Sequence, residues 1–219
     1  MRMNLSDLEI RVLGCLMEKE LATPESYPLT LNALAAACNQ KSNRDPVLSL
    51  SEAELQRGLE ALGGRGLARL TTTGGRVGKY VHSMADKLGL AAPARAVLAE
   101  LMLRGPQTAA ELRGRCERMV EVGDLAAVED ILLKLQQHGP PLVVRLPRQP
   151  GRKEPRYAQV FAGMPELPEE EPEQWSAAPA SRPRAGNERL EHLEQEVGAL
   201  RDEIGELRRE VEELLAAFS

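Results

Sequence analysis

Residues 51–83 read SEAELQRGLEALGGRGLARLTTTGGRVGKYVHS, and this stretch decides the fold that the sequence predicts. Ser51 with Glu54 three residues later is the pattern of a capping box, in which a hydroxyl and a carboxylate satisfy free backbone N–H groups. The glycines that follow favour the end of a helix, because glycine tolerates the left-handed cap conformation. Between these signals, apolar residues recur at helical spacing, at Leu55, Leu59 and Leu62.

A β-hairpin is expected directly after this helix. Residues 67–72 and 77–82 have the composition of short strands, and the glycine-containing residues 73–76 favour a turn between them. Three helices and a two-stranded hairpin make a winged-helix unit, a variant of the helix-turn-helix. The residues before position 51 should then supply two helices.

Two helical patterns are indeed present before position 51. The first opens on Ser6 with Glu9, a second capping-box pattern. Its apolar face consists of Leu8, Val12, Cys15 and Leu16. The second has Thr30, Leu34 and Cys38 at intervals of four residues, which also predicts a helix.

The whole unit recurs once along the chain. Thr108 with Glu111 repeats the capping pattern, and the expected second pair of strands lies at 142–146 and 156–161. Val12, Leu13, Leu16 and Met17 match Val97, Leu98, Leu101 and Met102 at an offset of 85 residues. Thr30, Leu34 and Cys38 match Thr108, Leu112 and Cys116 at an offset of 78. Leu55, Leu59 and Leu70 match Ile131, Leu135 and Leu146 at an offset of 76.

The predicted fold class is mainly α with small β-hairpins, an α+β arrangement of tandem winged-helix domains. The first domain is expected at residues 1–87 and the second at 88–163. Residues 164–186 hold five prolines and a cluster of acids, a composition that predicts a flexible linker. Trp175 lies in this linker, either as an incidental exposed residue or as an anchor for a partner.

Residues 187–219 carry a heptad pattern that predicts a coiled-coil helix. Branched side chains at most a positions and leucine at d favour two parallel strands, so a parallel homodimer is expected. A helix that packs back on its own chain is the alternative. The expected dimerisation residues are Leu190, Leu193, Val197, Leu200, Ile204, Leu207, Val211 and Leu214. The g–e pairs of a parallel dimer are opposite in sign at Arg189–Glu194, Glu196–Arg201 and Glu203–Arg208.

Composition and charge argue against several classes of protein. The net charge of −5 divides into +4 for residues 1–163 and −9 for 164–219, so only the front of the chain is weakly basic. No apolar run approaches the roughly 20 residues that span a bilayer, and no secretory signal is recognised, which predicts a cytoplasmic protein. The cysteines and histidines lack metal-ligand spacing, and the cysteines are expected to be small buried hydrophobes. No nucleotide-binding or catalytic motif is found, so we expect no metal, no cofactor and no enzymatic activity.

The polar run ACNQKSNRDPV, residues 37–47, is the part of the first unit with two open interpretations. In a helix-turn-helix protein this segment lies near the DNA backbone, where Lys41 and Arg44 could contact phosphates. Alternatively, its Asn and Asp side chains close turns and cap helices by bonding the local backbone, and Pro46 suits a helix start. Both interpretations stay open from the sequence alone.

The distribution of basic residues favours the hairpins over the recognition helices. The third helix of the first unit offers Arg57 among three glutamates, and that of the second offers Lys134 against Glu129 and Asp130. A basic wing can lie along the DNA backbone or enter the minor groove, although its arginines could instead pair with nearby acids. The expected wing residues are Arg76 and Lys79 in the first unit and Arg145, Arg148, Arg152, Lys153 and Arg156 in the second.

The segments EKELATPESYPLTLNALAAACNQKSNRDPV, LMLRGPQTAAELRGR and VRLPRQPGRKEPRYA together resemble the YceH-like family of uncharacterised bacterial proteins. The resemblance extends over nearly all of residues 5–163. It implies a tandem winged-helix fold in the bacterial cytosol, and relatives often end in a coiled coil. It implies no activity.

Two functions are compatible with these features. One is a dimeric, transcription-regulator-like protein that binds double-stranded DNA through its basic wings, with avidity from the coiled coil. The other is an adaptor that binds a protein partner through winged-helix surfaces, because a fold does not fix a function. The acidic recognition helices favour the second hypothesis, and the basic wings favour the first.

Overall fold

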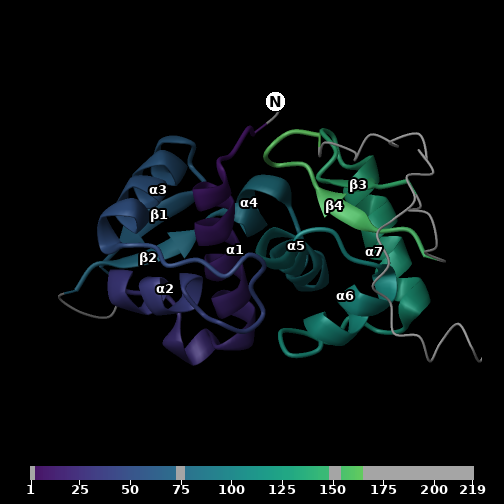
Figure 1. Cartoon of the computed structure of the whole chain (residues 1–219), viewed down its shortest axis with the longest axis horizontal. Helices are drawn as coiled ribbons and strands as arrows, with labels where there is room; N and C mark the ends of the chain where they lie inside the picture. Colours follow the sequence, from purple (N-terminus) through teal and green to yellow (C-terminus); the bar gives the residue numbers. More distant parts are fainter. Residues whose placement is uncertain (1–2, 73–76, 148–153, 165–219) are drawn as a thin grey trace, which may run out of the picture. The chain divides into compact units, whose positions relative to one another are not determined.

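The structure is a computed structural model that describes residues 3–72, 77–147 and 154–164. The described part is mainly helical, with two small antiparallel hairpins (Figure 1). The predicted linker at 164–186, apart from Met164, and the predicted coiled coil at 187–219 lie outside the described residues. Within the described residues, no helix is long and apolar enough to cross a membrane.

The elements occur in the order that the repeat predicts. The first repeat contains α1 (Asp7–Ala22), the short 3-10 helix η1 (Pro24–Ser26), α2 (Leu31–Cys38), α3 (Glu52–Gly64), β1 (Ala68–Thr71) and β2 (Lys79–His82). The second repeat contains α5 (Ala92–Arg104), α6 (Ala109–Cys116), α7 (Leu125–Gln137), β3 (Val143–Arg145) and β4 (Tyr157–Gln159). A short helix that the sequence did not predict, α4 (Met84–Leu88), precedes α5. The strands are shorter than expected, but both hairpins are present.

The three predicted capping boxes are confirmed. At the start of α1, the backbone N–H of Glu9 donates to Ser6 Oγ at 3.3 Å, and the Ser6 N–H donates to Glu9 Oε2 at 2.8 Å. The same reciprocal pair forms at the starts of α3 and α6. The cap of α7 is different, because the Asp124 carboxylate accepts from the N–H of Ala127 at 2.9 Å.

Each hairpin pairs with one residue that precedes the second helix of its repeat. Leu29 and Tyr80 exchange two backbone hydrogen bonds, from Leu29 N–H at 3.2 Å and from Tyr80 N–H at 2.7 Å. Gln107 and Tyr157 form the equivalent pair, at 3.0 and 2.8 Å. The two repeats therefore share the same arrangement of a hairpin and one added β-bridge, although the amino-acid sequences of the two repeats differ.

The structure corrects the register of the repeat at the third helix. The residues equivalent to the buried Leu55, Leu59 and Leu62 are Val128, Leu132 and Leu135, which are also buried. The offset is thus 73 residues and not 76, and the match of Leu55 to Ile131 is wrong because Ile131 is only half-buried. A helical apolar pattern resembles itself when it is shifted by three residues, so periodicity alone could not set this register.

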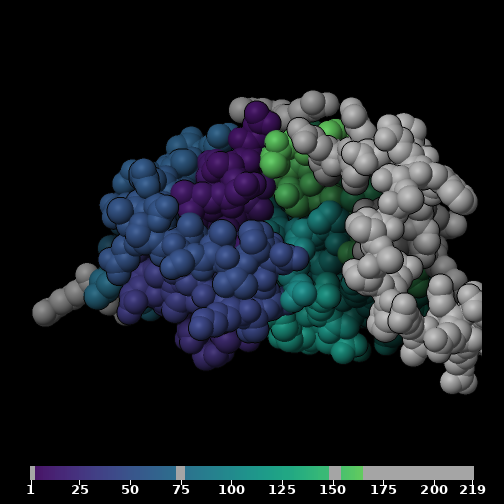
Figure 2. All heavy atoms as spheres, in the orientation of Figure 1, coloured from purple at the N-terminus to yellow at the C-terminus, as the bar shows by residue number. Residues whose placement is uncertain are grey.

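The two repeats pack against each other mainly through α1 and α5, which lie side by side (Figure 1). Both helices are buried along much of their length, and the apolar core continues from one repeat into the other. Gly14 lies at the contact, where an added Cβ would be 3.0 Å from the Cβ of Met102 and 3.1 Å from Leu103 Cδ2. The absence of a side chain at Gly14 therefore allows the close approach of α1 and α5. The described residues of both repeats therefore belong to one compact unit, whose surface is seen in Figure 2.

Candidate nucleic-acid interface

The polar run at residues 37–47 places Arg44 in the interior. Its side chain is fully buried, and the guanidinium donates to Glu18 Oε1 at 3.0 Å and to Glu18 Oε2 at 2.5 Å. It also donates to the carbonyl oxygens of Ala37 and Asn43 and to the side-chain oxygen of Gln40. These acceptors use the full donor set of a guanidinium. Arg44 is therefore not on the surface, where the expected phosphate contact requires it.

Arg44 belongs to a charged cluster between the two repeats, which we call the inter-repeat cluster: Glu18, Asn43, Arg44, Glu100 and Arg118. Arg118 Nη2 donates to Glu18 at 2.5 Å and to Glu100 at 2.7 Å, and both of these carboxylates are fully buried. Asn43 Nδ2 donates to Glu100 at 3.1 Å. The cluster therefore ties α1 of the first repeat to α5 of the second.

The inter-repeat cluster depends on extra length in the first repeat. Thirteen residues connect α2 to α3, whereas eight connect α6 to α7. The longer connection reaches the second repeat, and there the N–H of Asp45 donates to the Leu103 carbonyl at 2.9 Å. The extra residues thus fasten the two repeats together. No helix begins at Pro46, although a proline there suits a helix start, and α3 begins at Glu52, directly after the capping box expected at Ser51.

Charge balance makes the burial of this cluster tolerable. Burial raises the pKa of Glu18, but the hydrogen bonds and positive charges of Arg44 and Arg118 outweigh burial, so its pKa lies below the usual value. The pKa of Arg44 is raised despite its burial, because Glu18 stabilises the charged guanidinium. Buried charges persist when they are paired and hydrogen-bonded, as they are here.

The rest of the polar run closes the connection between α2 and α3. Asn39 Oδ1 accepts from the Leu50 N–H at 2.7 Å, and Asn39 Nδ2 donates to the Leu50 carbonyl at 2.8 Å. This is the turn-closing role that the alternative interpretation assigns to such side chains. Lys41 is exposed and has no ion-pair partner among the described residues.

Basic residues of differing exposure lie on the hairpins. Lys79 of β2 is half-buried, Arg145 of β3 is exposed, and neither forms an ion pair within the described residues. Arg156 differs, because it donates to the Pro106 carbonyl at 2.7 Å and pairs with Glu111 at 3.2 Å. Arg57 is exposed on α3. The remaining predicted wing residues, Arg76, Arg148, Arg152 and Lys153, lie outside the described residues.

Sequence reasoning missed Arg69, which belongs to the same surface. Arg69 is exposed on β1, between the buried Ala68 and the exposed Leu70. The pairing of Arg69 with Val81 and of Thr71 with Lys79 puts Arg69 and Lys79 on one face of the first hairpin, because side chains alternate along a strand. The signal was available, since the strand prediction at 67–72 already contained this arginine.

Carboxylates are scarce in the sequence around both hairpins but abundant on the helices before them. Residues 61–85 and 131–153 contain no Asp or Glu, although they contain nine Lys and Arg, and the loop between β3 and β4 contains one carboxylate, Glu154. By contrast, Glu52 and Glu60 of α3 and Glu129 and Asp130 of α7 are exposed. In both repeats positive charge is therefore concentrated on the hairpin and negative charge on the preceding helix.

The three cysteines and His82 lie in the interior of the described structure. Cys15, Cys38 and Cys116 are all buried, as predicted, and burial raises the pKa of Cys116 to about 12. His82 accepts from the Met84 N–H through Nδ1 and lies 3.0 Å from Glu20 through Nε2. Within the described residues, no group of three or more His, Cys, Asp or Glu side chains is arranged to hold a metal ion.

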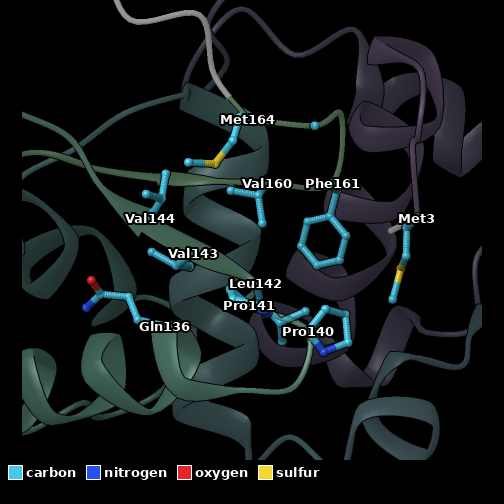
Figure 3. A pocket seen from close by; sticks show the side chains of 11 residues that line it. Met3, Gln136, Pro140, Pro141, Leu142, Val143, Val144, Val160, Phe161 and Met164 are labelled. Carbon is cyan, nitrogen blue, oxygen red and sulfur yellow. The ribbon is translucent and has the colours of Figure 1, made fainter. Parts of the chain in front are cut away.

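A groove of about 300 Å³ lies beside the second hairpin (Figure 3). Phe161 and Pro140 line it near Met3, and Val143 and Val144 line the opposite side. Among the described residues, Gln136 is the only polar side chain in its lining, and no charged residue contributes to it. The groove is therefore apolar and supplies no acid or base.

Comparison with known proteins places the chain in a family. The family model described as "Protein of unknown function, DUF480" matches residues 5–152. A UPF0502 protein of Citrifermentans bemidjiense is 72% identical over the full length of both chains. UPF0502 proteins of Geotalea uraniireducens and Geobacter metallireducens are 66% and 58% identical, over all of both chains and over 88% of each, respectively. The chain therefore belongs to the UPF0502 family, which the DUF480 model describes.

Proposed function

We propose that this protein is a non-enzymatic, cytoplasmic, dimeric DNA-binding protein whose basic hairpins contact the phosphate backbone. The observation that carries the proposal is the charge separation in both repeats, with cations on the hairpins and acids on the preceding helices. In this proposal each repeat is a winged-helix unit, consistent with the three helices and hairpin of each repeat and with the resemblance to the YceH-like family. A surface on which cations outnumber carboxylates is what a polyanion would bind.

Charge reversal on the two hairpins tests this interface. The double variant Arg69→Glu, Arg145→Glu is expected to weaken binding to mixed-sequence duplex DNA for all sequences alike. It should also reduce the slope of log K against log salt by about 0.9 for each phosphate that the variant no longer neutralises. Fluorescence anisotropy at several salt concentrations measures both quantities. Lys134→Glu is the control, because it reverses an exposed cation on α7, and it should leave the slope unchanged. An unaltered slope in the double variant would refute the hairpin interface.

Dimerisation through residues 187–219 is the second component of the proposal. Weak contacts by single wings would be strengthened if a coiled coil held four of them together. Sedimentation is expected to show a dimer for the full chain and a monomer for a chain that ends at residue 163. The truncated chain should also bind DNA more weakly. A monomeric full chain at tens of micromolar would contradict the dimer.

A surface on α7 favours the adaptor as a second candidate function. Leu125 and Leu133 are 44% and 49% exposed, and Glu129 lies between them at helical spacing. An apolar and acidic helix face suits a partner protein with cationic and apolar side chains. If the full chain binds no duplex at low salt, this surface becomes the favoured site, and charge removal at Glu129 and Asp130 should then release the partner.

A further inference from the structure

Cys15 and Cys38 form a pair of buried thiols between α1 and α2. Neither residue is exposed, and the two thiol groups lie within hydrogen-bonding distance of each other. The packing of α2 against α1 brings the two cysteines together, although they are far apart in the sequence. Two adjacent thiols can join as a disulfide when an oxidant removes two electrons, which a single buried cysteine cannot do.

Two guanidinium groups lie beside the thiol pair. Arg11 Nη1 donates to the Cys38 carbonyl at 3.1 Å. Arg44 Nη2 donates at 2.9 Å to the carbonyl of the residue before Cys38. Arg11, Cys15 and Glu18 are at helical spacing, so they lie on one side of α1. The thiols therefore adjoin two positive charges and one negative charge.

Cys15 is the thiol of the pair that ionises more easily. Burial raises its pKa, but the hydrogen bond from Cys38 and the positive charges of Arg44 and Arg11 outweigh burial, so the pKa of Cys15 lies below its usual value. The hydrogen bond with Cys15 and burial both raise the pKa of Cys38. Because a thiolate is a much stronger nucleophile than a thiol, Cys15 is the group that reacts first and Cys38 the group that follows.

The second repeat contains a matched cysteine without this pairing. Cys116 is at the position that matches Cys38, and Glu100 is at the position that matches Cys15. Cys116 is as buried as Cys38, but burial and the negative charge of Glu100 raise the pKa of Cys116 to about 12. The second repeat therefore has a carboxylate where the first has a second thiol, and Cys116 serves as an internal control.

We propose that Cys15 and Cys38 are a peroxide-reactive dithiol that forms a reversible disulfide. The Cys15 thiolate attacks one oxygen of hydrogen peroxide, the O–O bond breaks, and the released hydroxide takes up the proton that Cys15 lost. The Cys38 sulfur then attacks the sulfenic acid of Cys15, so that an S–S bond forms and the S–O bond breaks. The second hydroxide leaves as water with the Cys38 proton. The two thiols lose two electrons, and one peroxide becomes two molecules of water.

Peroxide reaches the thiols when the connection between α2 and α3 opens locally. Arg44 belongs to this connection, and Arg11 also donates to the Pro46 carbonyl at 2.6 Å, so the connection covers the charged side of the thiol pair. Residues 40–50 make one backbone–backbone hydrogen bond to the described residues, from the Asp45 N–H to the Leu103 carbonyl. Segments with few such bonds open at a lower free energy than the whole fold. The inference is independent of the proposed DNA binding.

The test exposes the folded full chain to hydrogen peroxide at neutral pH. The remaining thiols are then alkylated under denaturing conditions, and the cysteines are mapped by peptide mass spectrometry without reduction. A pair of peptides linked through Cys15 and Cys38 is expected, and dithiothreitol should separate them. Cys116 should be oxidised about tenfold more slowly or less, because its thiolate fraction is smaller.

Two variants distinguish the roles of the paired cysteines. Cys38→Ala should leave a sulfenic acid on Cys15 that dimedone traps, whereas Cys15→Ala should make Cys38 as slow to react as Cys116. Equal rates for Cys15 and Cys116 in the folded wild type would overturn the proposal, as would oxidation of all three cysteines only in urea. Oxidation of Cys15 without a link to Cys38 would also overturn it. Thermal melting verifies that each variant folds, and the wild-type map decides the question even if a variant does not.

Discussion

Replacing Arg44 by alanine is expected to lower the free energy of unfolding by about 3–5 kcal/mol. The substitution removes the buried partner of Glu18 and leaves a fully buried carboxylate with Arg118 as its remaining cation. It also leaves the Ala37 carbonyl without the guanidinium that it accepts from. Removal of one member of a buried pair costs more than the pair itself contributes, because the other charge stays out of water.

Urea denaturation of the two proteins at neutral pH measures this difference. Lys41→Ala is the matched control from the same polar run, because Lys41 is exposed and its removal should change stability by no more than about 0.5 kcal/mol. If Arg44→Ala and Lys41→Ala were equally stable, the buried inter-repeat cluster would not exist in solution.

The same cluster predicts a dependence of stability on pH. The pKa of Glu18 is lowered in the folded state, so its contribution is present above the unfolded pKa and is lost as pH falls through the folded pKa. Wild-type stability should therefore decrease as the pH drops below about 4.5, the ordinary value for a glutamate. Arg44→Ala removes the interaction that lowers the pKa of Glu18 the most. The free energy of unfolding of this variant should therefore fall less steeply than that of wild type as the pH decreases.

Gly14→Val is expected to destabilise the protein by about 3 kcal/mol, at the upper end of overpacking effects. The added Cβ would lie 3.0 Å from the Cβ of Met102, which is too close for a normal contact, and valine adds two further methyl groups. Because Met102 and Leu103 belong to α5, α1 and α5 must separate to accommodate valine. The substitution should therefore weaken the packing between the repeats as well as the overall stability.

Gly114→Ala is the matched control for this prediction. Gly114 also lies inside a helix, α6, but no heavy atom lies within 4 Å of an added Cβ. Alanine there should stabilise the protein by about 0.5–1 kcal/mol, because glycine costs that much in a helix interior. Thermal or urea denaturation should thus show opposite signs for the two substitutions. If Gly14→Val and Gly114→Ala both stabilised the protein, α1 and α5 would not be in close contact.

Local features of the fold were predictable from the sequence because their causes act over a few residues. The capping boxes at Ser6, Ser51 and Thr108 need only a hydroxyl and a glutamate three residues later. The repeat of helices and hairpins follows from apolar periodicity and turn residues in the same way. The exposed cations of the hairpins were also accessible, since strand alternation places Arg145 on the surface.

Tertiary structure alone decided which polar residues are buried and how the repeats are joined. Arg44 looked like a surface cation in the sequence, but its partner Glu18 lies 26 residues away, and Arg118 reaches Glu18 across 100 residues. Local sequence cannot reveal a charge balance that forms only when distant segments meet. For the same reason, apolar periodicity aligns α3 with α7 three residues away from the correct offset, because only packing shows which leucines face the core. The sequence thus determined the elements and their order, whereas long-range burial decided that residues 37–47 hold the two repeats together.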